Sequence, residues 1–342
     1  MDSATARPDP ALVAALEGLP GDLAGFARTY ETKIRPELLK REAERVKAAD
    51  TARKATWGGG ALALATGLGG VFGLKIPLLG MLGVMAGFGV IAFGRRPLGR
   101  LQKDAKGLMV RPVAEELGLA FDDEPGALAD LSGHRRLGLL PSYDRSRFED
   151  RLSGQRNGID FECFEAQLKR RKTETRNGRT TTRYVTVFKG QCLRFDFHKR
   201  FFGETLVTRD AGFFNRFGGK QGMDRARLED PRFEEAFEVY TSDQVEARYL
   251  LTPDMMSNLL DMERAFHGKK LRCAFSGEQM LVAVEGENLF EPGSLFDPLD
   301  DPARLRAILD DFSAVFGLID TASAGRRREA DERDGQPDQG GT

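Results

Sequence analysis

Residues 157–200, NGIDFECFEAQLKRRKTETRNGRTTTRYVTVFKGQCLRFDFHKR, mark the point where the chain's periodicity turns from helical to alternating. Apolar and polar residues alternate over 157–168 and 180–200, as expected of strands with one covered face. Between them, residues 170–183 read as a polar connection carrying Asn177-Gly178, a dipeptide that favours tight hairpin turns. The stretch predicts a β-hairpin within an antiparallel sheet.

The rest of the C-terminal half extends this pattern. The expected elements are strands over 204–210 and 237–243, a helix over 251–266, a hairpin over 270–286 turning at Gly277, and a last helix over 301–320. Pro253 and Pro302 each follow a residue suited to capping a helix, Thr252 and Asp301. Strand runs followed by helices predict an antiparallel α+β domain with its helices on one face, which we place at residues 95–320.

The most apolar stretch, residues 57–94, holds a single charge, Lys75, in 38 residues. One straight helix of that length would span about 57 Å, whereas a bilayer core is about 30 Å thick. The stretch therefore predicts two transmembrane helices, 57–74 and 76–93, with Lys75 and Pro77 at the hairpin tip. A buried glycine-rich hairpin or a re-entrant loop is the alternative.

Small residues recur every four positions in this stretch, at Ala61, Ala65, Gly69 and Gly73, and Gly83 and Gly87 repeat the spacing. They predict close helix packing, either against each other or against another copy. Basic clusters at 40–54 and 95–111 flank the stretch, so the positive-inside rule places both termini in the cytoplasm and makes the lipid bilayer a partner.

Residues 22–56 predict an amphipathic helix with a stripe of Phe26, Tyr30, Ile34 and Leu38, and with a kink or break at Pro36. A basic helix after residue 95 suits either an anionic leaflet or topology alone. The acidic N-terminus lacks the features of a secretory signal. Residues 1–21 and 321–342 are expected to be disordered.

Composition narrows the function classes. The net charge of -1 argues against a dedicated nucleic-acid partner. The three cysteines are widely spaced and exclude a disulfide framework or a zinc ribbon. Phosphate-binding glycine motifs are absent, and no cofactor or metal is expected.

The strand over 188–198 offers the one candidate for chemistry. Leu193, Phe195 and Phe197 alternate with a polar face that carries Cys192, Asp196 and His198. These three side chains could bind a metal, share a proton or supply a nucleophile. The alternative is a polar strand face turned toward water.

Other reactive residue types have simpler interpretations. Cys163 and Cys273 lie among apolar residues and are expected in the core. His134 and His267 stand in polar contexts and are expected to be exposed. The loop over 214–227 can present Arg216, Lys220, Arg225 and Arg227 to an anion or a lipid headgroup, or be only a surface loop.

Four segments form a set: YETKIRPELL, GLLPSYDRSRFEDRLSG, VFKGQCLRFDFHKRFFGETLVTRD and EDPRFEEAFEVYTSDQVEARYLLTPDMMSNLL. Together they resemble an uncharacterised bacterial membrane-protein family, domain of unknown function 3137, over residues 26–320. The resemblance implies a two-span hairpin in the bacterial inner membrane with a cytoplasmic α+β domain. It implies no activity, cofactor or catalytic residue. The most specific part of the resemblance is FEVYTSDQVEARYLLTP, residues 237–253. Within it, an ionic corner that locks a helix onto the sheet is suited by Asp243, Gln244, Glu246 and Arg248.

Two functional hypotheses follow. The first is a non-enzymatic binding or scaffold module, anchored at the inner membrane, with a protein partner. The second is a membrane-bound hydrolase or transferase that uses Cys192, Asp196 and His198.

Overall fold

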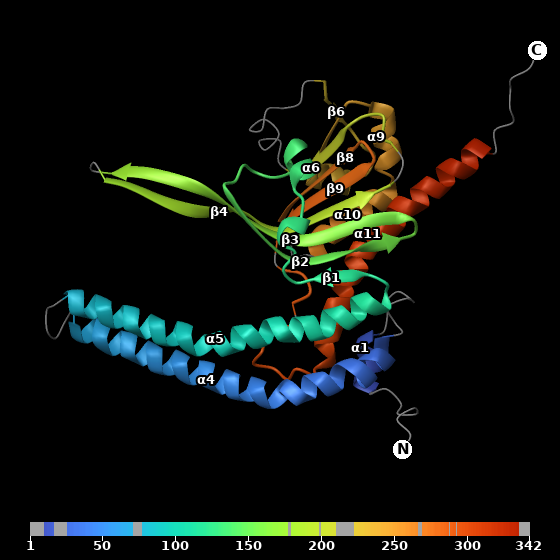
Figure 1. Cartoon of the computed structure of the whole chain (residues 1–342). Coiled ribbons are helices and arrows are strands. Elements are labelled where there is room, and N and C mark those ends of the chain that lie inside the picture. The colour runs from blue at the N-terminus through green and yellow to red at the C-terminus, as the bar shows by residue number, and fades with distance from the viewer. Residues whose placement is uncertain are drawn as a thin grey trace, which may run out of the picture. The chain divides into compact units, whose positions relative to one another are not determined.

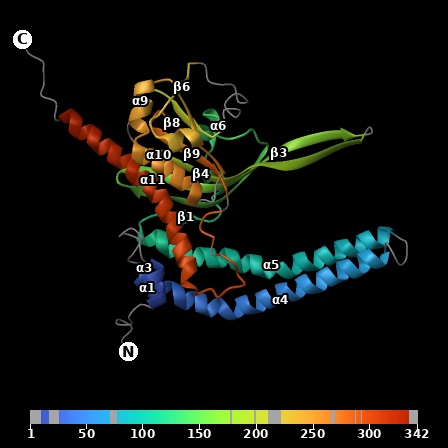
Figure 2. The ribbon, with the colours of Figure 1, turned by 180° about the vertical axis from the view of Figure 1, so that it is seen from behind.

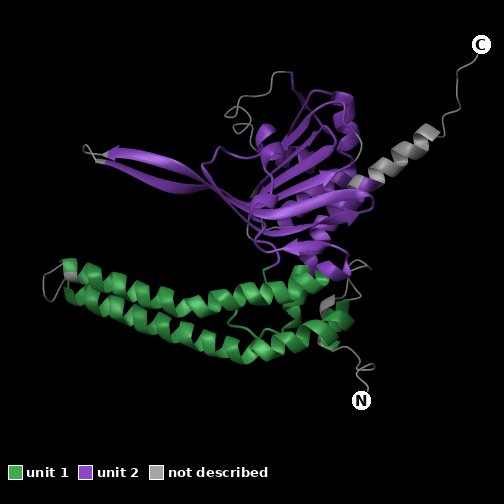
Figure 3. Cartoon of the chain, viewed as in Figure 1, with its two compact units in different colours: residues 1–113, 291–308 green, residues 114–290, 309–342 purple. Residues whose placement is uncertain are grey.

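The protein is described by a computed structural model over residues 10–16, 26–70, 77–176, 179–197, 200–209, 222–265, 269–286, 288–291 and 293–334. The chain forms two compact units, coloured green and purple in Figure 3. Unit 1 comprises residues 1–113 and 291–308, and unit 2 comprises residues 114–290 and 309–342.

Unit 1 is built from helices. Its elements are α1 (Pro10–Leu16), α3 (Phe26–Thr29), the π-helical turn η1 (Tyr30–Ile34), α4 (Arg35–Leu68) and most of α5 (Pro77–Glu116). Helices α4 and α5 lie side by side along their length in both Figure 1 and Figure 2.

The predicted N-terminal stripe is confirmed. Phe26, Tyr30, Ile34 and Leu38 are all at most 1% exposed. The predicted break at Pro36 takes the form of η1, in which the Arg35 N–H donates to the carbonyl of Tyr30. Proline has no N–H to donate, so the backbone ladder is already irregular at this position.

Glycines bring α4 and α5 into close contact. A Cβ on Gly59 would lie 2.6 Å from the carbonyl oxygen of Gly87, and a Cβ on Gly87 would lie 2.5 Å from that of Gly59. Gly94 approaches Ala55 in the same way. Of the small residues predicted to pack, Gly83 and Gly87 of α5 contact α4, one of the two arrangements that the sequence left open. The prediction was wrong for α4, because Ala61, Ala65 and Gly69 are exposed. Gly59 makes the α4 contact instead.

The larger apolar side chains of this pair point outward. The most exposed are Trp57, Leu64, Leu78, Met81, Phe88 and Phe93. The outer surface of this helix pair therefore carries many large apolar side chains.

The predicted transmembrane hairpin is not supported. Within the part of the chain that the structure describes, no helix is both long and apolar enough to cross a membrane. Residues 57–68 are the apolar end of α4, an otherwise charged helix, and would span about 18 Å, while 77–93 of α5 would span about 26 Å before Arg95 and Arg96. Both lengths fall short of a bilayer core of about 30 Å. This finding corrects the two membrane spans and the inner-membrane location with cytoplasmic termini. Lys75 lies outside the described residues, and Pro77 begins α5.

Unit 2 contains an antiparallel sheet, as predicted. Its described strands are β1 (Ala120–Asp122), β2 (Arg145–Arg156), β3 (Ile159–Arg176), β4 (Arg179–Asp196), β5 (Thr205–Thr208), β6 (Asp224–Ala226), β7 (Glu238–Thr241), β8 (Lys269–Ser276) and β9 (Gln279–Glu285). The order across the sheet is β1-β2-β3-β4-β9-β8-β5-β7-β6.

Tight turns set the register of two of its hairpins. Asn157 and Gly158 have φ values of 52° and 73° between β2 and β3, the left-handed conformation that a short hairpin turn needs. Gly277 turns β8 into β9 with a φ of 65°. The second of these turns was predicted from the sequence, and Cys273 pairs with Val282 across it.

Both faces of the sheet are covered in its centre. On one face lie the longer helices α10 (Pro253–Ala265) and α11 (Pro302–Asp334), which are seen in front of the strands in Figure 2. Phe316 of α11 stacks edge-on against Phe161 of β3. The other face is covered by the short helix α6 (Ser132–Arg136) and its flanking segments, where Leu139 and Leu140 are buried. The longer helices thus share one face as predicted, and a shorter one occupies the other.

Short elements complete unit 2. They are the 3-10 turn η3 (Gly126–Leu128), α8 (Pro231–Ala236) and α9 (Gln244–Leu250).

The predicted helix starts are confirmed. The Met255 N–H donates to the Thr252 hydroxyl at 3.2 Å, and the Ala303 N–H donates to Asp301 at 2.9 Å. Helix α11 continues through Asp334, past residue 321 where the disordered tail was expected to begin. Alanine, glutamate and arginine favour helix and are frequent in this segment, so local propensity is sufficient for the extension. Disorder was also expected over residues 1–21, but Pro10–Leu16 form α1, in which Leu12 is buried. Residues 1–9, 17–21 and 335–342 lie outside the described residues.

Candidate functional site

A two-stranded ribbon extends beyond the sheet where β3 and β4 pair only with each other. The register pairs Arg170 with Val185 and ends with Arg176 opposite Arg179. Strand β2 pairs with β3 only as far as Lys169, and β9 meets β4 only from Gly190 onward. Seven paired positions at about 3.4 Å each give a free ribbon of about 24 Å. Figure 1 shows it projecting from the strands of unit 2.

Glycine is required where this ribbon leaves the sheet. Gly190 has a φ of 157°, and a Cβ there would collide with the carbonyl of Val284 on β9. A side chain at this position would therefore push β9 away from β4. The close approach fixes where three-strand pairing stops and the free ribbon starts.

The ribbon was not predicted from the sequence. Residues 170–183 were expected to form a polar connection, whereas β3 continues to Arg176 and β4 begins at Arg179. Because β3 and β4 pair with each other here, the charged residues of this segment form an ordered surface. Alternation of charged and threonine residues up to Asn177-Gly178 was the signal for two continuous strands.

One face of the ribbon is cationic. Alternate residues share a face, so Arg170 and Lys172 of β3 lie with Arg183 of β4. All three are exposed. Glu174 on the same face binds Lys172 Nζ and Arg183 Nη2, each at 3.0 Å. These two cations hold the pKa of the Glu174 carboxyl below its usual value.

The opposite face is largely neutral. Its cross-strand pairs include Thr173 with Thr182 and Thr175 with Thr180, whose hydroxyl oxygens are 3.3 Å and 3.1 Å apart. Tyr184 lies on this face opposite Arg171. Threonine is β-branched and favours strands, and its hydroxyl pairs add cross-strand hydrogen bonds. This face therefore stabilises an otherwise isolated hairpin.

Contacts with neighbouring residues anchor the base of the ribbon. The Arg145 guanidinium on β2 stacks over the Tyr184 ring, 3.7 Å from its centre. The Arg171 backbone N–H donates to the Asp144 carboxylate at 2.6 Å, and Arg170 Nη1 donates to the Ser142 hydroxyl at 3.3 Å. The ribbon is held in a defined direction where it emerges from the sheet.

The ribbon is strongly basic, although the net charge of the whole chain is close to zero. Residues 170–185 contain six basic side chains and one acidic one, a net charge of +5. The whole chain carries -1, so the remaining residues carry -6. Overall charge is thus a poor guide to the electrostatics of this surface.

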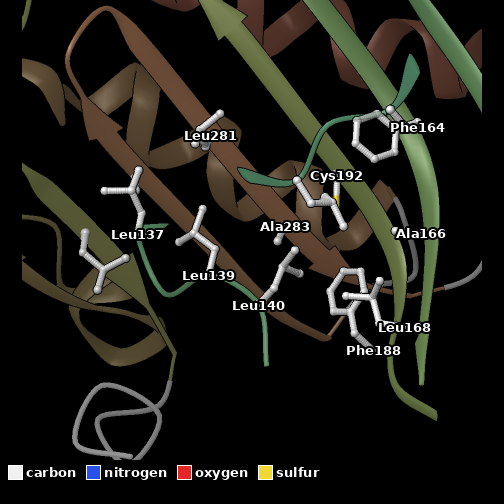
Figure 4. Close-up of a cluster of buried hydrophobic side chains, with 14 residues drawn as sticks. Leu137, Leu139, Leu140, Phe164, Ala166, Leu168, Phe188, Cys192, Leu281 and Ala283 are labelled. Carbon is white, nitrogen blue, oxygen red and sulfur yellow. The ribbon is translucent and has the colours of Figure 1, made fainter. Parts of the chain in front are cut away.

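The structure does not bring the predicted Cys192, Asp196 and His198 trio to an open surface. Cys192 is fully buried, packed with Phe164, Phe188 and Leu281 in the core cluster of Figure 4. Burial raises the pKa of its thiol well above the usual value. Asp196 is half-buried near the end of β4, and His198 lies outside the described residues. Because α6 and its flanks cover this strand face, the thiol is kept protonated and away from solvent.

The other thiols match the sequence interpretation. Cys163 and Cys273 are fully buried, and burial raises the pKa of both. Over the described residues, no group of three potential ligands could hold a metal ion.

The predicted basic loop is only partly described. Arg216 and Lys220 lie outside the described residues. Arg225 lies in the short strand β6, exposed, with its guanidinium 3.7 Å from Glu238. Arg227 follows β6 and is exposed. An anion or lipid contact at these four residues stays a prediction.

His134 was expected to be exposed, but it is 1% exposed. Its Nε2 lies 3.1 Å from the carbonyl oxygen of Leu193 on β4 and 3.2 Å from that of Val282 on β9. Both partners only accept hydrogen bonds, so Nε2 carries the proton and donates to both. Desolvation lowers the pKa of His134 to about 4. The ring is a neutral structural link between α6 and the sheet.

The predicted ionic corner is present as a set of hydrogen bonds. Asp243 caps α9 by accepting from the Val245 and Glu246 N–H groups. The Glu246 carboxylate accepts from the Phe202 and Gly203 N–H groups at 2.8 Å and 2.7 Å. The corner fixes the loop before β5 to α9, which is a structural role.

Unit 1 contains a small cavity of about 300 Å³ beside Tyr30 and Arg35. The Tyr30 hydroxyl donates to the Asp300 carbonyl at 2.7 Å, and Arg35 Nη1 pairs with Glu31 at 3.1 Å. The polar groups at this cavity therefore serve the packing of unit 1.

The comparisons with known proteins gave a family match and an alignment with a solved structure. None of the curated proteins compared with this sequence matches it. A crystal structure of the mycobacterial trehalose monomycolate transport factor A, TtfA, aligns with a TM-score of 0.30 and 13% identity, over 64% of this chain and 97% of that one. A TM-score this low carries no argument about fold or function.

The family match covers the C-terminal part of the chain. It includes the segments 187–210 and 229–260 of the sequence resemblance, while the segments at 30–39 and 138–154 lie outside it. The whole free ribbon, residues 170–185, also lies outside it. Residues 186–323 match the family described as a protein of unknown function (DUF3137), which confirms the family that the resemblance named.

Proposed function

We propose that this protein is a non-enzymatic binding module that engages an anionic partner through the basic ribbon. The observation that carries this proposal is the free ribbon itself, with Arg170, Lys172 and Arg183 exposed on one face. A two-stranded hairpin is marginally stable alone in water and adds no packed core to the sheet. A charged projection of this kind is suited to contact another molecule.

The chemistry around the sheet supports binding over catalysis. Two of the buried charged residues, Arg272 and Glu263, are engaged in structural contacts. Arg272 donates to the Leu139 carbonyl and to Glu285, and Glu263 accepts from Arg209 and from the Leu271 N–H. The alternative of a hydrolase or transferase needs a reactive Cys192, and its burial opposes that role.

Retention on immobilised heparin, a generic polyanion, tests the proposal with the purified full chain. The ribbon variant Arg170→Thr/Lys172→Thr/Arg183→Thr keeps strand propensity and removes three charges. The matched control Arg232→Gln/Arg248→Gln/Arg264→Gln removes three exposed charges from α8, α9 and α10 of the same unit. We expect the wild type and the control to elute at similar salt and the ribbon variant at clearly lower salt. Equal elution of all three proteins would refute the ribbon as the contact surface.

A further inference from the structure

We propose that the ribbon binds double-stranded B-form DNA by entering its major groove. This inference rests on the proposed function and names the class of its anionic partner. Three observations carry it: the bare two-stranded form of the ribbon, its length, and the composition and placement of its charges.

The form of the ribbon fits a groove. The major groove of B-DNA is about 12 Å wide and about 8.5 Å deep and admits a two-stranded β-ribbon. Such a ribbon must be free of a third strand on both edges. Over Arg170–Arg176 and Arg179–Val185, the described strands pair only with each other, and β2 and β9 stop before this part begins.

The length of the ribbon is sufficient for specific contact. A free ribbon of about 24 Å matches about seven base pairs at about 3.4 Å per step. Side chains on one strand face repeat about every 6.8 Å, so Arg170 and Lys172 reach successive positions along the groove.

The charged groups suit phosphates and base edges. Two arginines, Arg170 and Arg183, lie on the cationic face beside Lys172. Guanidinium groups form bidentate hydrogen bonds with phosphate and with the O6 and N7 atoms of guanine. Glu174, the one acid on this face, is already paired with Lys172 and Arg183.

The charge of the rest of the chain orients the contact. Residues outside 170–185 carry a net charge of -6, whereas the ribbon carries +5. A DNA duplex repels the first and attracts the second, so the protein approaches with the ribbon foremost. The overall charge of -1, which argued against a nucleic-acid partner, averages these two opposite surfaces.

Fluorescence anisotropy with a labelled 20-base-pair DNA duplex tests the inference on the full chain. Its arms are the same sequence as a single strand, a duplex RNA of equal length, and polyglutamate as a competitor. The major groove of duplex RNA is deep and narrow and does not admit the ribbon. We therefore expect tighter binding to duplex DNA than to either other nucleic acid, and little competition from polyglutamate.

Salt dependence links binding to the named side chains. Each phosphate contact contributes about -0.9 to the slope of log affinity against log salt. Arg170→Thr/Lys172→Thr/Arg183→Thr should reduce the magnitude of that slope by about 2 to 3 and weaken binding at least about tenfold at 0.1 M salt. The helix control Arg232→Gln/Arg248→Gln/Arg264→Gln should keep both. Arg170→Lys/Arg183→Lys preserves charge and strand pairing and should keep the slope. Comparison with the threonine variant then separates lost charged contacts from a misfolded ribbon.

The outcomes separate the inference from the proposed function. Ribbon-dependent retention on heparin without preference for duplex DNA would overturn the inference and leave the proposed function standing. The same applies if polyglutamate competes as well as DNA, because the partner would then be an acidic protein segment. Equal weakening by the helix control would overturn the inference, and an absence of both heparin and DNA binding would overturn both proposals.

Discussion

Burial of His134 predicts a specific acid sensitivity of unit 2. The ring donates from Nε2 to the carbonyls of Leu193 and Val282 and is 1% exposed. Desolvation is the largest influence and lowers the pKa of His134 to about 4 in the folded protein. Arg194 also disfavours the charged ring, while Asp130 and the two carbonyls favour it.

The sign and size of the effect follow from proton linkage. The unfolded chain has an ordinary histidine pKa of about 6.5, so between pH 6.5 and 4 it binds more protons than the folded chain. The contribution is fully present above pH 6.5 and is lost as the pH falls toward 4. The two pKa values differ by the equivalent of about 3 kcal/mol, and about 2 kcal/mol of this is lost between pH 7 and 4.5.

The assay compares wild type with His134→Gln at pH 7 and pH 4.5. The glutamine amide can donate to both carbonyls and does not titrate. Urea unfolding, followed by the strand signal in circular dichroism, gives the free energy of unfolding of each protein. Carboxyl groups titrate equally in both, so the difference between the two pH dependences reports His134 alone.

Three results bear on the reasoning. We expect the wild type to lose about 2 kcal/mol more than His134→Gln over this pH interval. His134→Leu should be destabilised by about 1–3 kcal/mol at pH 7, because two buried carbonyls lose their donor. An NMR signal absent from His134→Gln that titrates near pH 6.5 in the folded wild type would refute the buried neutral ring.

Three further expectations concern other parts of the chain. Glu246→Ala should cost about 1–3 kcal/mol in urea unfolding, because the Phe202 and Gly203 N–H groups lose their acceptor, whereas the exposed Glu235→Ala should change little; equal effects would contradict the corner. Gly59→Ala should lower thermal stability by about 1–3 kcal/mol through its collision with Gly87, while Gly60→Ala, which meets no atom within 4 Å, should be neutral or stabilising; a tolerated Gly59→Ala would show that α4 and α5 are not in close contact. Cys163, Cys192 and Cys273 should react with a thiol reagent only after denaturation, because all three are buried with raised pKa values; rapid native labelling lost in Cys192→Ser would revive a nucleophilic role.

Local signals in the sequence determined much of the sheet domain. The alternation in 157–168 and 180–200 predicted β3 and β4, and Gly277 predicted the turn between β8 and β9. Thr252 and Asp301 predicted helix starts because a cap depends on hydrogen bonds within a few residues. These features need only neighbours along the chain.

Features that depend on distant residues were not predicted. The alternation around Cys192 shows that successive side chains of β4 point to opposite faces of the sheet. It does not show that α6 and its flanking segments cover the face that carries Cys192. His134 looked exposed among arginines, and only the placement of α6 on β4 and β9 buries its ring. Length, apolar composition and basic flanks suggested two membrane spans, whereas the apolar part of α4 that the structure describes is short and joined to a charged helix.

The basic ribbon shows the same division within one segment. The sequence by itself determined its charge and its threonines, because these are properties of residues 170–185. The turn predicted at Asn177-Gly178 lies outside the described residues. Only the tertiary structure decided that the segment is free, since this depends on where β2 and β9 stop pairing with β3 and β4. Pairing of β3 with β2 ends at Lys169, and pairing of β4 with β9 begins at Gly190. These limits, and not the charges, define where the two strands pair only with each other.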